Sequence, residues 1–171
     1  VSRIGDLVGE SEARIAATGK VIGNLDSGSL VMRGDFMDKY PQLAEAYIKT
    51  ELEAQRYLLA PENWSNVIEM LSKHATGISK QVLWYSLYGQ IPQEVGGAKV
   101  RGWKAFVWTD ELRTNIEDMY VFLSKEKVIK YDKPLAGTID DSIARKVLKE
   151  AGLTTPLGSI IGQPPEKVPF K

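Results

Sequence analysis

Residues 28–41, GSLVMRGDFMDKYP, and the helical pattern that follows them decide the fold. Residues 29–33 form a short apolar run, which predicts a strand. A helical pattern begins at residue 35, where Asp38 can cap a helix and Pro41 suits a first-turn position. Apolar residues then recur at helical spacing as far as Leu58. The stretch therefore predicts a passage from a strand into a long helix.

Two further helices are expected after this one. Pro61 marks the start of the first, and Gly77 closes it. Its apolar stripe has the spacing of one helical face, at Trp64, Val67, Ile68, Leu71 and Ala75. Residues 78–88 predict the second helix, which ends at Gly89. Together they predict that residues 37–88 are dominated by helix, with breaks near residues 60–61 and 76–77.

The rest of the chain predicts an irregular connection, two more helices and a tail. Residues 89–102 hold four glycines and one proline, which is typical of a long loop. Thr109 caps the next helix, with acidic residues in its first turn, and its expected buried face consists of Leu112, Ile116, Met119, Tyr120 and Leu123. Asp140 opens the last helix and Gly152 follows its end. The inward residues expected for that helix are Ile143, Ala144, Val147, Leu148 and Ala151.

The expected strands are too few to form a stable sheet on their own. Residues 20–23 also predict a short strand, joined to the run at 29–33 by turn-forming residues. Two isolated strands do not form an independently stable sheet. We therefore expect them to need further strands, and we divide the chain into a hinge-proximal segment (1–36), a helical region completing the lobes (37–153) and an extended C-terminal tail (154–171).

Composition argues against several functional classes. Lysine plus arginine equals aspartate plus glutamate, 22 of each, so the formal net charge is zero and a nucleic-acid partner is not expected. The chain has no cysteine and one histidine, His74, which leaves no set of residues for a thiolate or multi-histidine metal site. No nucleophile, base and acid stand at a recognisable spacing. We expect no enzyme activity, no metal and no cofactor.

The candidate ligand-binding residues lie on the turn between the two expected strands: Asn24, Asp26, Ser27 and Ser29. Short polar side chains and backbone N–H groups beyond strand ends often form the wall of a ligand cleft. The same residues are equally typical of an ordinary Asx turn, and this simpler interpretation is favoured. The aromatic residues Trp84, Tyr85 and Tyr88 share one helix, where burial in the core is the more frequent role. His74 is interpreted as structural.

The order of these features resembles the solute-binding proteins of the nitrate/sulfonate/taurine type that serve ABC transporters. The resemblance begins with the acidic-Phe pair and the Lys-Tyr-Pro step at residues 35–41. It continues through the helix at 42–59, which carries alanines and tyrosines, and through the segment 61–76. It ends with the helix opened by Thr109, Asp110 and Glu111. It covers most of residues 19–153.

The resemblance implies an α/β fold of the periplasmic-binding-protein-like type II, with only the C-terminal portion present here, mostly helical with two short strands. It also implies partners: a small, anionic or zwitterionic solute, an ABC permease and a preceding N-terminal lobe of the same protein, in a periplasmic or extracytoplasmic location. Two alternatives stay open. One is an enzyme on the same fold, like a desulfinase or a pyrimidine-precursor synthase, and the other is a helical protein-interaction domain.

Overall fold

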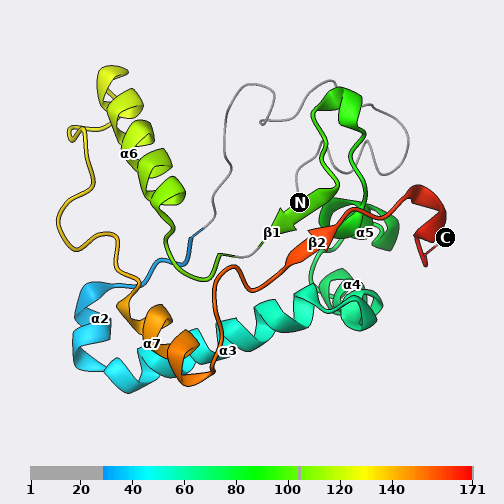
Figure 1. Ribbon diagram of the computed structural model, residues 1–171, viewed down its shortest axis with the longest axis horizontal. Coiled ribbons are helices and arrows are strands. Elements are labelled where there is room, and N and C mark those ends of the chain that lie inside the picture. The colour runs from blue at the N-terminus through cyan, green and yellow to red at the C-terminus, as the bar shows by residue number, and fades with distance from the viewer. Residues whose placement is uncertain (1–28, 104, 171) are drawn as a thin grey trace. The chain divides into compact units, whose positions relative to one another are not determined.

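The computed structural model describes residues 29–103 and 105–170 (Figure 1). This part of the chain is mostly helical with two antiparallel strands, as expected for the coarse fold class. The α-helices are α2 (Gly34–Lys39), α3 (Pro41–Leu59), α4 (Trp64–Ser72), α5 (Lys80–Tyr88), α6 (Asp110–Lys125) and α7 (Ser142–Glu150). The strands are β1 (Val100–Trp103) and β2 (Ser159–Ile161), and the short 3-10 turns are η2 (Pro61–Asn63), η3 (Gln93–Val95) and η4 (Pro165–Lys167).

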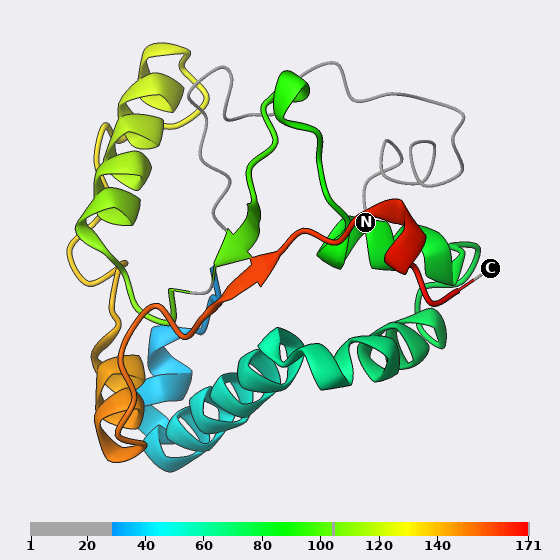
Figure 2. The ribbon, with the colours of Figure 1, turned by 45° about the vertical axis from the view of Figure 1, so that its right-hand side comes forward.

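The positions of the strands differ from the expected ones. Residues 29–33 carry no strand, so that prediction is wrong, and the expected strand at 20–23 lies outside the described residues. Val31 is 86% exposed, and no strand of the described residues pairs with the run at 29–33, although a strand needs a partner for its backbone groups. The observed strands β1 and β2 come instead from the end of the glycine-rich connection and from the tail, and both views place them side by side (Figures 1 and 2).

Most helix boundaries follow the predicted signals. α3 begins at Pro41, and α5 ends at Tyr88 with Gly89 as its C-cap. The Thr109 hydroxyl accepts a hydrogen bond of 3.2 Å from the Leu112 N–H at the start of α6, which is the expected cap. Asp38 was expected to cap α3, but it lies inside the short helix α2. Sequence signals for helix ends are therefore reliable here where a cap or a proline supplies a local reason.

The described residues divide into two compact units. Among the described residues, the first unit gathers 54–103 and 158–170, and the second gathers 29–53 and 105–157. α3 contributes its first thirteen residues to the second unit and its last six to the first. Each unit has its own hydrophobic cluster.

The core of the first unit is aromatic and aliphatic. Its buried residues are Trp64, Val67, Ile68, Leu83, Trp84, Tyr88 and Ile160. These residues come from α4, α5 and β2, so the two helices and the ribbon share one interior. The apolar stripe predicted for α4 is confirmed at its first three positions, whereas Leu71 is 38% exposed. Leu71 stands at the end of α4, next to the turn that leads to Gly77, and the core does not extend that far.

The core of the second unit lies between α3 and α7. Its buried residues are Leu52, Val107, Val147 and Leu148. Ile143 and Ala144 pack against them, as predicted, but Ala151 is exposed because α7 ends at Glu150. Gly152 has a φ of +66°, in the left-handed region that glycine favours after a helix.

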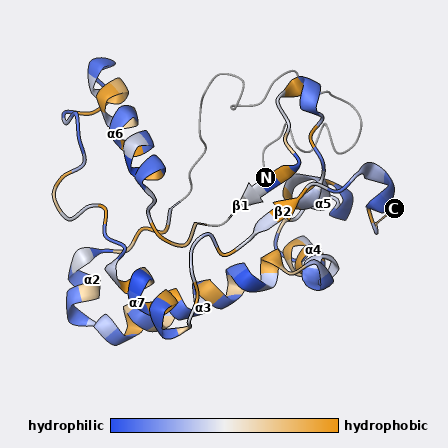
Figure 3. Cartoon of the chain, in the orientation of Figure 1, coloured by the Kyte–Doolittle hydropathy of each residue, from blue (hydrophilic) through white to orange (hydrophobic). Residues whose placement is uncertain are grey.

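Helix α6 differs most from its expectation. It has sixteen residues and none of them is buried. Of the five residues predicted for its buried face, four are half-buried and Met119 is exposed, whereas Phe122, which was not among them, is 60% exposed. Figure 3 shows apolar residues along the helix. Amphipathic spacing indicated correctly which face of α6 is apolar, but within the described residues that face is only half-buried.

Ile68 and Leu71, two residues of equal size on α4, offer a direct test of this packing. Ile68 is fully buried, whereas Leu71 is 38% exposed. We predict that Ile68→Ala costs about 2–5 kcal/mol of unfolding free energy, because it leaves a cavity in the core. Leu71→Ala on the same helix should cost about 1 kcal/mol or less, because less apolar area is lost. Urea denaturation followed by near-ultraviolet circular dichroism measures both, and equal losses would contradict the packing described here.

A second test concerns the turn at Gly97, whose N–H donates a 2.9 Å hydrogen bond to the Pro92 carbonyl. A Cβ at this position would lie 2.0 Å from the Ile91 carbonyl oxygen, a contact that requires the backbone to move. We predict that Gly97→Ala costs about 1–3 kcal/mol, as other overpacking substitutions do. Gly102→Ala is the matched control, because a Cβ there meets no atom within 4 Å. The turn is not constrained as described if both variants unfold at the same urea concentration.

Candidate functional site

The structure describes one of the four predicted ligand-binding residues. Ser29 is exposed and belongs to no helix or strand. Asn24, Asp26 and Ser27 lie outside the described residues, so the predicted cleft wall stays a prediction. The sequence argument placed Ser29 at the start of a strand, and the absence of that strand removes one reason for a cleft at this position.

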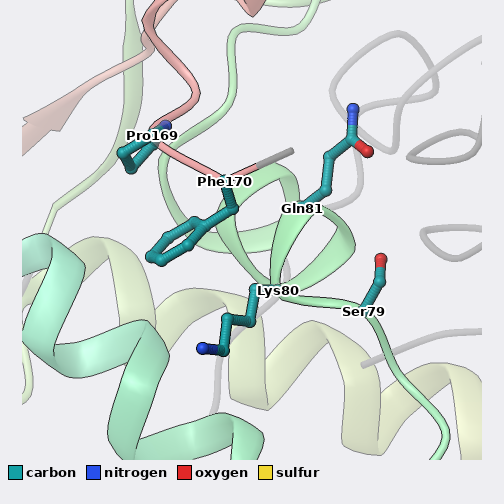
Figure 4. A pocket seen from close by; sticks show the side chains of 5 residues that line it. All are labelled: Ser79, Lys80, Gln81, Pro169 and Phe170. Carbon is teal, nitrogen blue, oxygen red and sulfur yellow. The ribbon is translucent and has the colours of Figure 1, made fainter.

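A surface pocket of about 480 Å³ lies in the first unit. It is lined by Ser79, Lys80, Gln81, Pro169 and Phe170, so the start of α5 and the C-terminal tail form it together. In Figure 4 the Phe170 ring and the Lys80 side chain extend toward the same side, whereas Gln81 points away from them. Sequence reasoning missed this pocket because its two walls are 88 residues apart, counted from Gln81 to Pro169.

Two of the polar residues of this pocket, Ser79 and Lys80, already have partners. The Lys80 Nζ lies 2.6 Å and 2.7 Å from the two carboxylate oxygens of Glu69 and 5.8 Å from the centre of the Phe170 ring. The Ser79 hydroxyl accepts a hydrogen bond from the Val82 N–H and so caps α5. A capping serine and a paired lysine serve the fold, and the lining contains no nucleophile with a base beside it.

The aromatic residues of α5 form part of the core, as predicted. The Trp64 ring stacks on Tyr88 with centroids 4.5 Å apart, and Trp84 meets Tyr88 edge-to-face at 5.3 Å. The Tyr88 hydroxyl donates a 3.3 Å hydrogen bond to the Leu58 carbonyl, and burial raises the pKa of Tyr88 to about 12. A buried, protonated tyrosine among stacked rings stabilises packing and leaves no open face for a flat ligand.

Asp141 is the best-connected acid of the second unit. Its side chain is only 10% exposed and accepts hydrogen bonds from the Trp108 N–H at 3.0 Å and from the Arg145 Nη2 at 2.8 Å. Arg113 on α6 lies 3.4 Å from the other oxygen. Asp140 was expected to open α7, but the N-cap position is Asp141; the Asp140 carboxylate lies just before it and accepts a hydrogen bond from the Ser142 N–H at 2.8 Å. Asp141 thus connects the segment before α6 to the start of α7. The sequence around Asp141 did not predict this connection.

Four charged side chains connect α3 to α7. Lys49 lies 2.8 Å from Glu45 and 3.1 Å from Glu150, and Lys146 pairs with Glu45 and, at 3.7 Å, with Glu150. Lys146, and then Lys49, lower the pKa of Glu45 from 4.5 to about 2. The alternation of signs leaves no net charge, so this network supports helix packing and does not attract a charged ligand.

The described residues hold no group of three metal-ligating side chains. His74 is exposed in the turn after α4, where its backbone N–H donates to the Leu71 carbonyl at 3.0 Å. Within the part of the chain that is described, no helix is both long and apolar enough to cross a membrane.

Comparison of the chain with protein families, with curated proteins and with solved structures found no match. Proposals about its function therefore rest on the residues and their geometry.

The charge network predicts a pH response. Because the pKa of Glu45 is lower in the folded chain than its ordinary value, its pairing stabilises the fold above pH 4.5 and is lost as the pH falls from 4.5 toward 2. We predict a carboxyl titration midpoint near 2 for Glu45 by carbon-13 NMR. In Lys146→Met the midpoint should return toward 4.5, whereas Lys80→Met, which breaks the pair with Glu69 in the first unit, should leave it unchanged. A midpoint near 4.5 in the unaltered chain would show that the network does not form in solution.

Proposed function

We propose that this chain is the C-terminal part of an extracytoplasmic solute-binding protein that captures a small anionic or zwitterionic solute and delivers it to an ABC importer. The observation that carries the proposal is the incompletely buried apolar face of α6, together with the order of helices along the chain. Both are features of a polypeptide that completes its packing with additional structure, and the resemblance of residues 19–153 indicates which kind.

The stability of α6 depends on how its apolar face is packed. Isolated helices shorter than about 12–15 residues are marginal in water, and most helices in proteins are stabilised by packing an apolar face. α6 has sixteen residues, no buried residue and an exposed phenylalanine and methionine on it. Burial of such side chains contributes about 1.5–3 kcal/mol each. We infer that further sequence, the preceding N-terminal lobe in this proposal, covers the α6 face.

The two-stranded ribbon supports the same inference. β1 and β2 pair only with each other among the described strands, so the outer edges of the ribbon have no partner strand there. Ile160 anchors the ribbon in the core of the first unit, but its neighbours Ser159 and Ile161 are exposed. A larger sheet, as found in the lobes of a two-lobed binder, would pair the free edges.

In this proposal the chain acts by binding and closure, without catalysis. Solute binding between two lobes stabilises the closed form, and the binding free energy offsets the cost of closure. The permease then recognises the closed form at the membrane, in a periplasmic or extracytoplasmic location. No cofactor or metal takes part, which agrees with a chain of one histidine and no cysteine.

A helical protein-interaction domain is the second candidate, because the apolar face of α6 is equally suited to a partner protein. The two candidates differ in what completes the packing. A solute-binding protein covers α6 with its own polypeptide, whereas an interaction domain leaves α6 open until a separate chain binds. The following experiment distinguishes them.

We predict that the full-length native protein binds one member of a panel of sulfonates, nitrate and pyrimidines with micromolar affinity in a calorimetric titration. The 171-residue chain alone should bind none of them more tightly than about 1 mM, which corresponds to a free energy near −4 kcal/mol. A neutral sugar serves as the negative control for both proteins. Micromolar binding by the isolated chain would contradict the two-lobed proposal, and absence of solute binding by the native protein would favour the interaction domain.

A further inference from the structure

Arg101 occupies an irregular position in the ribbon. Val100 pairs with Ile161 and Gly102 pairs with Ile160, so two steps along β1 match one step along β2. Arg101 is therefore the extra residue of a β-bulge. Bulges redirect a side chain away from the regular alternation of a strand and occur often beside binding sites.

The arginine that the bulge presents is half-buried and incompletely paired. Its Nη2 donates a 3.1 Å hydrogen bond to the Ser86 carbonyl, and its Nε is buried without any hydrogen-bond partner. No carboxylate of the described residues lies within 4 Å of the guanidinium, in contrast to Arg33, Arg113 and Arg145, each of which pairs with an aspartate. Burial lowers the pKa of Arg101, and the nearby Tyr85 opposes that shift.

A cation in this situation favours an anionic ligand. Burial of a charge without a counter-charge is costly, and the cost falls when an anion accepts its free N–H groups. The planar guanidinium presents paired N–H donors that match the two oxygens of a carboxylate, sulfonate or similar oxoanion. Gly102, the next residue of β1, adds no side chain beside the bulge, and a Cβ there would meet no atom within 4 Å.

We propose that Arg101 is an anion-binding residue, and that its half-buried guanidinium holds the carboxylate or sulfonate group of a small solute. The identity of that solute as the transported one rests on the function proposed above. The contact between Arg101 and an oxoanion does not, because it follows from the bulge and from the unpaired Nε.

The test observes the Nε–H of Arg101 directly by proton–nitrogen NMR in the 171-residue chain, with methanesulfonate as the probe at constant ionic strength. We expect a saturable shift of this signal at millimolar concentrations. Dimethyl sulfone, a neutral molecule of nearly the same shape, should produce no saturable shift. The Arg145 Nε–H is the internal control, because it already donates to Asp141 at 3.0 Å and should not respond. A non-saturable shift of the Arg101 signal, or equal shifts with both probes, would overturn the inference.

Two substitutions extend the test. Arg101→Gln should weaken methanesulfonate binding roughly tenfold or more, the usual scale for loss of a charged hydrogen bond, and Arg101→Lys should restore only part of it because the paired donors are lost. Arg145→Gln should leave the affinity unchanged. Unaltered aromatic NMR signals establish that each variant is folded. If a variant does not fold, the shift of the Arg101 signal in the chain without substitutions decides whether the anion binds. Binding that survives Arg101→Gln in a folded variant contradicts the proposal.

The failure of this inference and the failure of the proposed function have different signatures. Micromolar solute binding by the native protein that Arg101→Gln leaves unchanged would overturn the role of Arg101 and retain the solute-binding function. A saturable Arg101 shift in the chain, with no solute bound by the native protein, would retain the anion site and overturn the transport function.

Discussion

The stack of Trp64 on Tyr88, with Trp84 edge-on to both rings, is the interaction on which the first unit depends. It joins α4 to α5, and Ile160 packs into the same cluster and so anchors β2. Because β1 is paired only with β2 among the described strands, the position of the bulge at Arg101 follows from that anchor. The candidate anion site is therefore a consequence of core packing, and a change in the aromatic stack would be transmitted to it through the ribbon.

Local chemistry made much of the helical fold predictable. Pro41, Thr109 and Gly152 act within one turn of their own positions, as a first-turn proline, a cap and a left-handed residue. Since these effects need no distant partner, sequence patterns place the corresponding helix boundaries well. The core role of Trp64 and Trp84 was also predictable, because large aromatic residues at helical spacing contribute most when buried.

The features that depend on distant partners were not predictable from one sequence. β1 and β2 pair across about sixty residues, and neither segment has a strong strand pattern of its own, whereas the apolar run at 29–33 has the pattern but no partner. The sequence around Arg101 does not predict a bulge, because a bulge exists only relative to the opposite strand. For α6, periodicity identifies the apolar face but cannot say what covers it.

The central claim is that the apolar face of α6 is covered by other parts of the same protein. Hydrogen–deuterium exchange of the α6 amides, compared between the 171-residue chain and the full-length native protein, measures this directly. The account predicts rapid exchange along α6 in the chain and strong protection in the native protein, with α4 and α5 protected in both. Equal exchange of α6 in the two proteins would contradict it.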